Sequence, residues 1–166
     1  IARLGLDQPL LARFLHFLGG MMQGDFGLSY RTQEGVGAMI AARLPATIEL
    51  AFASLLVTLF VGVPLGVLCG VRPNAAISRV VMLVSIAGIT LPNFVVGVLL
   101  IAIFSVQLGW FPSFGRGQTV DLGGWTTGLL TLSGWQAVIL PAITLAAFQV
   151  TFVIRMLRTQ LLEVGQ

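Results

Sequence analysis

Three long stretches without a charged side chain constrain this chain more than any other feature of its sequence. They lie between Glu49 and Arg72, between Arg79 and Arg116, and between Asp121 and Arg155. Each is longer than the roughly 20 apolar residues that cross a hydrocarbon core of about 30 Å. The alternative is a buried core helix of a soluble protein, but such helices are usually shorter and keep one polar face. The pattern therefore predicts membrane-spanning helices.

The composition supports this interpretation. Hydrophobic residues make up 57% of the chain and charged residues only 9%, and the mean hydropathy is +0.98. Soluble domains are about one quarter charged, so this chain has too few charges to cover a surface in water. The net charge of +3 comes from scattered arginines without lysine, which argues against a nucleic-acid-binding patch. The lone Cys69 cannot form an internal disulfide, and we interpret it as a small core residue.

We expect an all-α, polytopic membrane protein with three transmembrane helices. They are placed at about residues 44–71, 80–106 and 137–157, within a domain of residues 41–166. Pro45 and Pro141 are expected in first helical turns, where a missing N–H costs little. Pro64 and Pro92 lie inside spans, where membrane helices tolerate proline.

The arginines predict the orientation of the spans. The link 72–79 carries Arg72 and Arg79, and Arg155 and Arg158 end the third span. The positive-inside rule places both ends in the cytoplasm. The connection 107–136 then lies outside. Its aromatic residues are suited to an interfacial belt or a re-entrant cap, and they are Trp110, Phe111, Phe114, Trp125 and Trp135.

Residues 1–40 are expected to form an extracytoplasmic or interfacial amphipathic segment. Its apolar residues follow helical spacing at Leu10, Leu11, Phe14, Leu15 and Leu18. By alternation of the spans, the segment lies on the outer side and along the interface. The only histidine, His16, is interpreted as a surface residue and not as a ligand.

Small residues recur at every fourth position of the first span, and they include Gly62, Gly66 and Gly70. Such a ridge lets another helix backbone approach closely, which promotes helix association in lipid. Packing within one subunit is the favoured interpretation. An interface with a second membrane subunit is the alternative.

Polar residues at membrane depth suggest a lined path. Thr90 and Asn93 share one stripe of the second span beside Pro92, and Thr151 lies in the third span. We expect these three polar side chains to line a water-accessible substrate path, with Ser85 and Gln149 behind them. Hydrogen bonding between helices by Asn93 and Thr90 is the alternative interpretation.

No catalytic constellation is recognisable in the sequence. It contains no nucleophile–base pair, no metal-ligand spacing and no phosphate-binding loop. We therefore expect neither an enzyme nor a metal or cofactor bound by this chain. A membrane-embedded enzyme is improbable for the same reason. No acidic residue lies deep in a span, which argues against a proton- or sodium-coupled pump.

Eight strings resemble, in order, the dipeptide/oligopeptide-type ABC-transporter permeases. They are LGLDQP (4–9), GDFGLS (24–29), RLPATIEL (43–50), VGVPLGVL (61–68), GITLPNF (88–94), LGWFP (108–112), LPAITL (140–145) and RMLRTQLLEV (155–164). The likeness covers essentially the whole chain.

The resemblance implies a six-helix, MetI-like permease subunit of a type I ABC importer in the bacterial inner membrane. The three spans would be its second to fourth helices, with a first helix before Ile1 and a coupling loop after Val164, so the chain is expected to be a fragment. Gly165 and Gln166 depart from the family's pattern.

The resemblance also implies partners. These are a second permease subunit, identical or different, two cytoplasmic ATPases that bind ATP and Mg²⁺, and an extracytoplasmic substrate-binding protein. Dipeptides, longer peptides, glutathione and nickel complexes all remain open as substrates. The alternative function is a secondary transporter or channel subunit without ATPases.

Overall fold

The computed structural model describes residues 9–164. Residues 1–8, which carry most of the LGLDQP string, and Gly165 and Gln166 lie outside the described residues, as do the side chains of Ala87 and Ile89. The chain divides into two compact units, one ending at Pro45 and the other beginning at Ala46. Each is considered by itself.

The first unit consists of helix α1 (Leu10–Met22), a tight turn and the start of α2 (Val36–Val57). The turn closes on itself through backbone hydrogen bonds. The Asp25 N–H donates to Gly20 O at 2.8 Å, and the Val36 N–H donates to Gly27 O at 2.9 Å. Gly27 has a φ of 76°, which glycine adopts without steric cost. Helix α1 is the helix that the apolar spacing between Leu10 and Leu18 predicted.

Helix α2, the π-helical turn η2 (Thr58–Gly62) and α3 (Val63–Val71) follow one another without a break and form one long helix. The helix begins at Val36 and not near residue 44, so Pro45 lies inside it. The prediction that Pro45 lies in the first turn was wrong. The π turn directly precedes Pro64, whose ring would otherwise clash with the carbonyl four residues earlier.

The second apolar segment is interrupted. Helix α4 (Ala76–Thr90) ends before Leu91 and Pro92, and α5 (Asn93–Leu100) continues into the π-helical η3 (Ile101–Gln107). The predicted span 80–106 is therefore not one continuous helix. Proline explains the break, because the residue before it is disfavoured in helical conformation.

A short hairpin interrupts the connection to the last helix. Strand β1 (Val120–Asp121) pairs antiparallel with β2 (Thr126–Thr127), and the turn between them includes Gly123 and Gly124 at positive φ. The chain is otherwise mostly helical among its described residues, so the all-α prediction is confirmed apart from this hairpin.

Helix α6 (Leu132–Val164) is the last element. Its N-cap is Thr131, whose Oγ1 accepts a hydrogen bond from the Gly134 N–H at 3.1 Å. Because the helix starts at Leu132, Pro141 lies well inside it. The prediction that Pro141 lies in the first turn was wrong.

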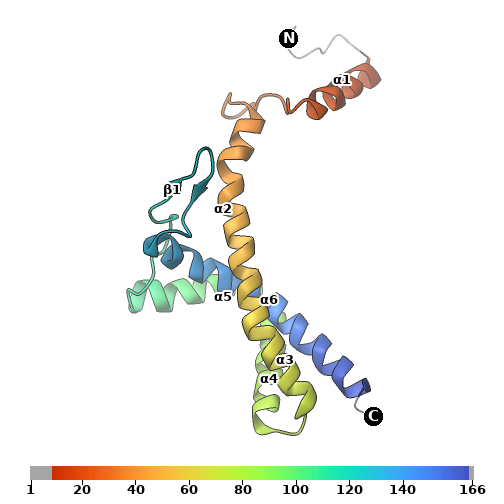
Figure 1. Ribbon diagram of the computed structural model, residues 1–166, viewed down its shortest axis with the longest axis vertical. Helices are drawn as coiled ribbons and strands as arrows, with labels where there is room; N and C mark the ends of the chain where they lie inside the picture. Colours follow the sequence, from red (N-terminus) through yellow and green to blue (C-terminus); the bar gives the residue numbers. More distant parts are fainter. Residues whose placement is uncertain (1–8, 165–166) are drawn as a thin grey trace. The chain divides into compact units, whose positions relative to one another are not determined.

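The helices of the second unit pack around α6. It contacts η2 and α3 on one side and α4 and α5 on another, as Figure 1 shows. The buried apolar residues are mostly small. They are Ala53, Cys69, Ala137, Leu140, Ala142, Ala146 and Ile154. Cys69 is fully buried, which confirms its interpretation as a small core residue.

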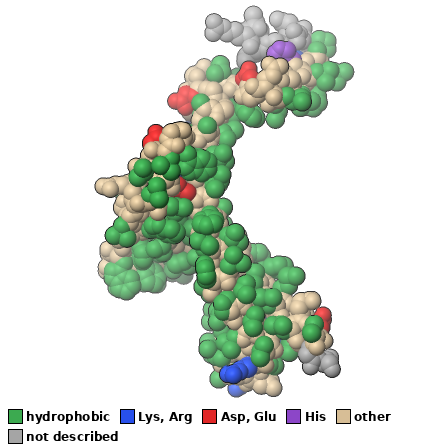
Figure 2. Space-filling view, in the orientation of Figure 1, with side chains coloured by type: hydrophobic (Ala, Val, Ile, Leu, Met, Phe, Trp, Pro, Cys, Tyr) green, Lys and Arg blue, Asp and Glu red, His purple; other side chains and the backbone are tan. Residues whose placement is uncertain are grey.

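Most large hydrophobic side chains point outward, and they cover much of the visible surface in Figure 2. Two helices, Val36–Val71 and Leu132–Val164, are long and apolar enough to cross a bilayer. The segment between them contains only shorter apolar helices, so the count of three spans stays a prediction.

Candidate functional site

The break between α4 and α5 places two predicted path residues at a gap in the helical backbone. Thr90 ends α4 and Asn93 begins α5, and both are exposed. The Thr90 hydroxyl donates to Ile86 O at 3.3 Å. Pro92 caps α5 with an extended ψ of 138°, and its carbonyl accepts from the Val95 N–H at 2.9 Å. Thr90 and Asn93 thus flank an irregular piece of backbone.

Thr151 and Ser85 lie elsewhere, inside the helix packing. Both are buried, at 4% and 3% exposure. The Thr151 hydroxyl donates to Ala147 O at 3.0 Å. A Cβ on Gly88 would lie only 2.9 Å from Thr151 Oγ1. Thr151 therefore contacts α4 at its glycine, three residues after Ser85.

A second glycine repeats this arrangement on α5. A Cβ on Gly97 would lie 3.2 Å from Thr144 Cγ2 of α6. Gly88 and Gly97 are therefore the points where the broken segment meets α6. The sequence contained a signal for these helix contacts, because both glycines are small residues in an apolar segment that also contains polar residues.

Gln149 joins α6 to the π turn. The Thr58 hydroxyl donates to Ser54 O at 2.8 Å and lies within hydrogen-bond distance of Gln149 Oε1, at 3.2 Å. Thr58 is buried and begins η2. Gln149 is thus separated from Thr90 and Asn93, on the side of α6 that faces the long helix.

The glycine ridge of the long helix packs against α6. A Cβ would lie 3.4 Å from Val150 Cα at Gly62, 3.0 Å from Leu157 Cβ at Gly66, and 2.7 Å from Leu161 Cβ at Gly70. These are intramolecular contacts, and they tighten along the helix toward Gly70.

A buried carboxylate was not recognised as structural from the sequence. Glu49 is only 4% exposed. Its Oε2 lies 3.4 Å from Arg116 Nη2, and its Oε1 accepts from the Gly128 N–H at 3.1 Å. Arg116 also donates to Thr126 O at 3.1 Å. This cluster holds the loop that carries β1 beside α2 (Figure 1).

Close backbone contacts reinforce the same loop. The Cβ positions of Gly117 and Gly134 would overlap with the backbone of Ser133 and of Gly128, respectively. The Thr131 hydroxyl donates to Gln118 O at 2.6 Å. The connection is therefore a compact, hydrogen-bonded element and not a loose linker.

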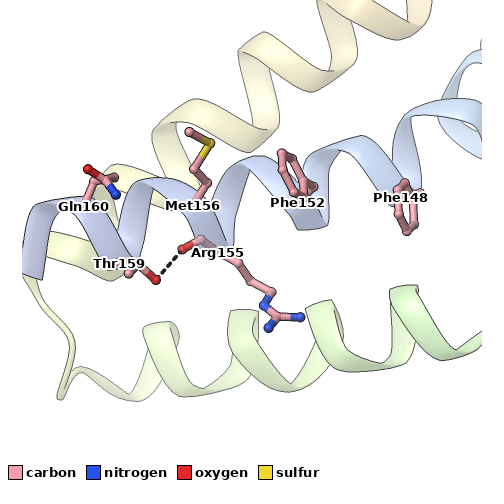
Figure 3. A pocket seen from close by; sticks show the side chains of 6 residues that line it. All are labelled: Phe148, Phe152, Arg155, Met156, Thr159 and Gln160. Atoms are coloured by element: carbon pink, nitrogen blue, oxygen red, sulfur yellow. Dashed lines mark hydrogen bonds between the residues drawn. The ribbon is translucent and has the colours of Figure 1, made fainter.

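One side of α6 borders an open groove of about 610 Å³. The lining residues all come from this helix, and Figure 3 shows them along it: Phe148, Phe152, Arg155, Met156, Thr159 and Gln160. The Thr159 hydroxyl donates to Arg155 O at 3.0 Å. Arg158 Nε is buried without a hydrogen-bond partner among the described residues.

Among residues 9–164 with described side chains, no group of three or more His, Cys, Asp or Glu could hold a metal ion. The polar residues of the site are threonine, serine, asparagine and glutamine, which form hydrogen bonds but supply no strong nucleophile. Such side chains can form hydrogen bonds with a polar solute.

Comparison of the amino-acid sequence with known proteins places this chain in a class of membrane transport components. Residues 62–164 match the family described as the binding-protein-dependent transport system inner membrane component. The chain therefore belongs to this family, whose members are permease components of transporters and not catalytic enzymes.

The similar proteins within this family include permeases named for glutathione and peptide transport. The glutathione transport system permease protein GsiC of Escherichia coli (strain K12) is 35% identical over 162 residues, which are 98% of this chain and 48% of that protein. The same protein of Shigella dysenteriae serotype 1 (strain Sd197) matches equally. A protein of Brucella abortus (strain 2308), named as a candidate peptide transport system permease, is 36% identical over 97% of this chain. The chain spans about half the length of these curated relatives.

Proposed function

We propose that this chain is part of a permease subunit of an ABC importer in the bacterial inner membrane and that it forms part of the transmembrane path for a peptide. The single observation that carries the proposal is the match of residues 62–164 to the family of binding-protein-dependent inner membrane components. The substrate class rests on relatives named for glutathione and peptide transport. Glutathione is itself a tripeptide, so both names point to short peptides.

The partners follow from this assignment. A second permease subunit completes the path, two cytoplasmic ATPases bind ATP and Mg²⁺, and an extracytoplasmic protein delivers the substrate. The chain has no lysine and no phosphate-binding loop of its own, so the energy must come from another subunit. Transport then proceeds by alternating access, in which ATP binding to the partners shifts the equilibrium between inward- and outward-open states.

We place the path at the interruption of the second apolar segment. Irregular backbone at membrane depth is tolerated where protein buries it or where it borders water. Exposed Thr90 and Asn93 at the break support direct lining. Thr151 and Gln149 contact neighbouring helices and Ser85 is buried, which supports a role for these three residues in holding the helices around the path.

An uptake assay tests the function. The complete gene is expressed in a deletion strain that retains the other transporter genes, and labelled dipeptide, oligopeptide, glutathione and nickel are supplied. We expect uptake of a peptide that is lost when the binding protein is deleted or the phosphate-loop lysine of the ATPase is replaced. Uptake that persists without a functional ATPase would support a secondary transporter or channel instead and would overturn the proposal.

A further inference from the structure

Helix α1 presents one apolar side whose residues are not buried in the part of the chain that the structure describes. At about 100° per residue, its eight large apolar residues fall within an arc of about 160°. Every one of them is exposed, from 38% at Met21 to 91% at Met22. They are Leu10, Leu11, Phe14, Leu15, Phe17, Leu18, Met21 and Met22. None of the residues of α1 is buried.

The opposite side of α1 is small and polar. It carries Ala12, Arg13, His16, Gly19 and Gly20. No acidic residue occurs within the helix, so Arg13 is its only permanent charge. A helix with one continuous apolar side and a small opposite side that carries Arg13 and His16 can lie in the plane of a membrane surface.

The length of α1 excludes a membrane span. Its 13 residues measure about 20 Å at 1.5 Å per residue, which is shorter than a hydrocarbon core of about 30 Å. An apolar surface of this size is also unusual in water, where it marks a binding surface. The helix can bury its apolar side in lipid only by lying flat.

The turn after α1 keeps the helix at the start of a membrane-spanning helix. The Asp25 N–H donates to Gly20 O, and the Val36 N–H at the start of α2 donates to Gly27 O. A Cβ on Gly37 would lie 3.5 Å from both Gly24 O and the ring of Phe26. Because α2 continues as the apolar helix that ends at Val71, only this turn separates α1 along the chain from a helix that is apolar enough to cross a bilayer.

We propose that α1 is a membrane-surface anchor that buries its apolar side in the lipid headgroup boundary at the entry of α2. Figure 2 shows hydrophobic side chains gathered over α1. Arg13 lies next to the apolar arc, where its long side chain can reach lipid phosphate while its stem stays in the apolar layer. The occupant of this surface is lipid and not a second protein.

Spin labelling of the complete transporter in phosphatidylethanolamine–phosphatidylglycerol liposomes tests this anchor. Single cysteines replace Phe14 and Leu18 on the apolar side, and Ala12 and His16 on the polar side serve as matched controls. All four side chains are exposed, so no packing contact is lost. Native Cys69 is fully buried, and the unsubstituted protein measures its background.

The readout is the collision rate of each label with oxygen, which concentrates in lipid, and with a water-soluble nickel chelate. We expect the oxygen-to-nickel ratio to be several-fold higher at Phe14→Cys and Leu18→Cys than at Ala12→Cys and His16→Cys. Equal nickel access at all four positions would place α1 in water and overturn the proposal. Immobile labels shielded from both reagents at Phe14→Cys and Leu18→Cys would also overturn it, because a protein would then cover this side.

Discussion

Glu49 is the residue whose chemistry is least expected in an apolar helix. Its two carboxylate oxygens have different partners. One accepts a hydrogen bond from the buried Gly128 N–H, and the other lies near Arg116 Nη2. The Arg116 side chain is 36% exposed, so water screens the ion pair and its contribution is modest. The hydrogen bond to buried Gly128 matters more, since an unsatisfied buried N–H costs about 1–3 kcal/mol.

A graded series at Glu49 tests this division. We expect Glu49→Ala to destabilise the protein by about 1–3 kcal/mol, because it leaves the Gly128 N–H without its acceptor. Glu49→Gln keeps an acceptor and loses only the charge, so it should cost at most about 1 kcal/mol. Thermal unfolding in detergent measures both. Glu34→Gln, at an exposed acid, is the control, and equal losses in all three variants would contradict the expectation.

The polar residues at the helix break allow a second test at the residue scale. If Thr90 and Asn93 line the path, Thr90→Ala and Asn93→Ala should each lower peptide uptake about two- to tenfold, which corresponds to one net hydrogen bond. Expression and membrane insertion should not change. Thr119→Ala, at an exposed position just before β1, is the matched control. Unchanged uptake at all substrate concentrations would remove both residues from the path.

At the scale of the elements, glycine determines how closely α6 approaches its neighbours. The long helix contacts α6 through Gly62, Gly66 and Gly70, and the broken segment contacts it through Gly88 and Gly97. Helices in lipid gain little from burying apolar surface against each other, so close packing of this kind supplies much of their association. Small buried residues and large outward residues follow from the same physics.

Alanine substitutions along the ridge should become more costly toward Gly70. Gly62→Ala meets ordinary contact distances and should change stability by less than about 1 kcal/mol, whereas Gly70→Ala should cost about 1–3 kcal/mol by overpacking against Leu161. Thermal unfolding in detergent measures the difference. Gly19→Ala is the control, because its Cβ would meet nothing within 4 Å. A uniform effect along the ridge would show that contact with α6 does not limit these positions.

The contact of α4 with α6 can be tested by compensation. Gly88→Ala places a Cβ only 2.9 Å from Thr151 Oγ1, closer than an ordinary contact, and should destabilise the protein by about 1–3 kcal/mol. Thr151→Ala removes that atom, so the double variant should recover part of the loss, with a coupling of at least about 0.5 kcal/mol. Strictly additive losses would contradict a direct contact.

At the scale of the whole molecule, the arginines predict which side of the membrane each connection faces. The link with Arg72 and Arg79 and the end of α6 with Arg155 and Arg158 are rich in arginine, which predicts a cytoplasmic location for both. The loop with β1 and β2 must then face outward, and the broken segment α4–α5 must cross the membrane despite its interruption.

Cysteine labelling of intact spheroplasts with an impermeant thiol reagent tests this topology. Thr119→Cys in the outer loop should react in intact cells, and Asn74→Cys in the arginine-rich link should react only after disruption. Both positions are exposed, and the parent protein with buried Cys69 is the control. Reaction of both variants in intact cells would mean that α4 and α5 form a re-entrant hairpin and do not cross.

The sequence by itself determined the membrane class and the approximate positions of the long helices. These properties depend on local quantities, namely the length of uncharged stretches, the periodicity of apolar residues and the placement of arginine. The amphipathic helix near Leu10 could be predicted for the same reason, whereas Pro92 was taken as a tolerated residue inside one span and the helix is interrupted there. Helix starts were less accurate, because Pro45 and Pro141 were taken as first-turn residues although the helices extend beyond them.

Only the tertiary structure decided which side chains meet. Thr151 and Ser85 have the composition of a polar lining, yet they are buried, and Thr151 packs against Gly88. In the sequence Glu49 only marks the start of an uncharged stretch, yet Arg116 and Gly128, far along the chain, form its site. Periodicity states which face of a helix a residue occupies, but the neighbour of that face depends on how separate helices cross. That crossing is determined by packing across long sequence separations, which a local pattern does not contain.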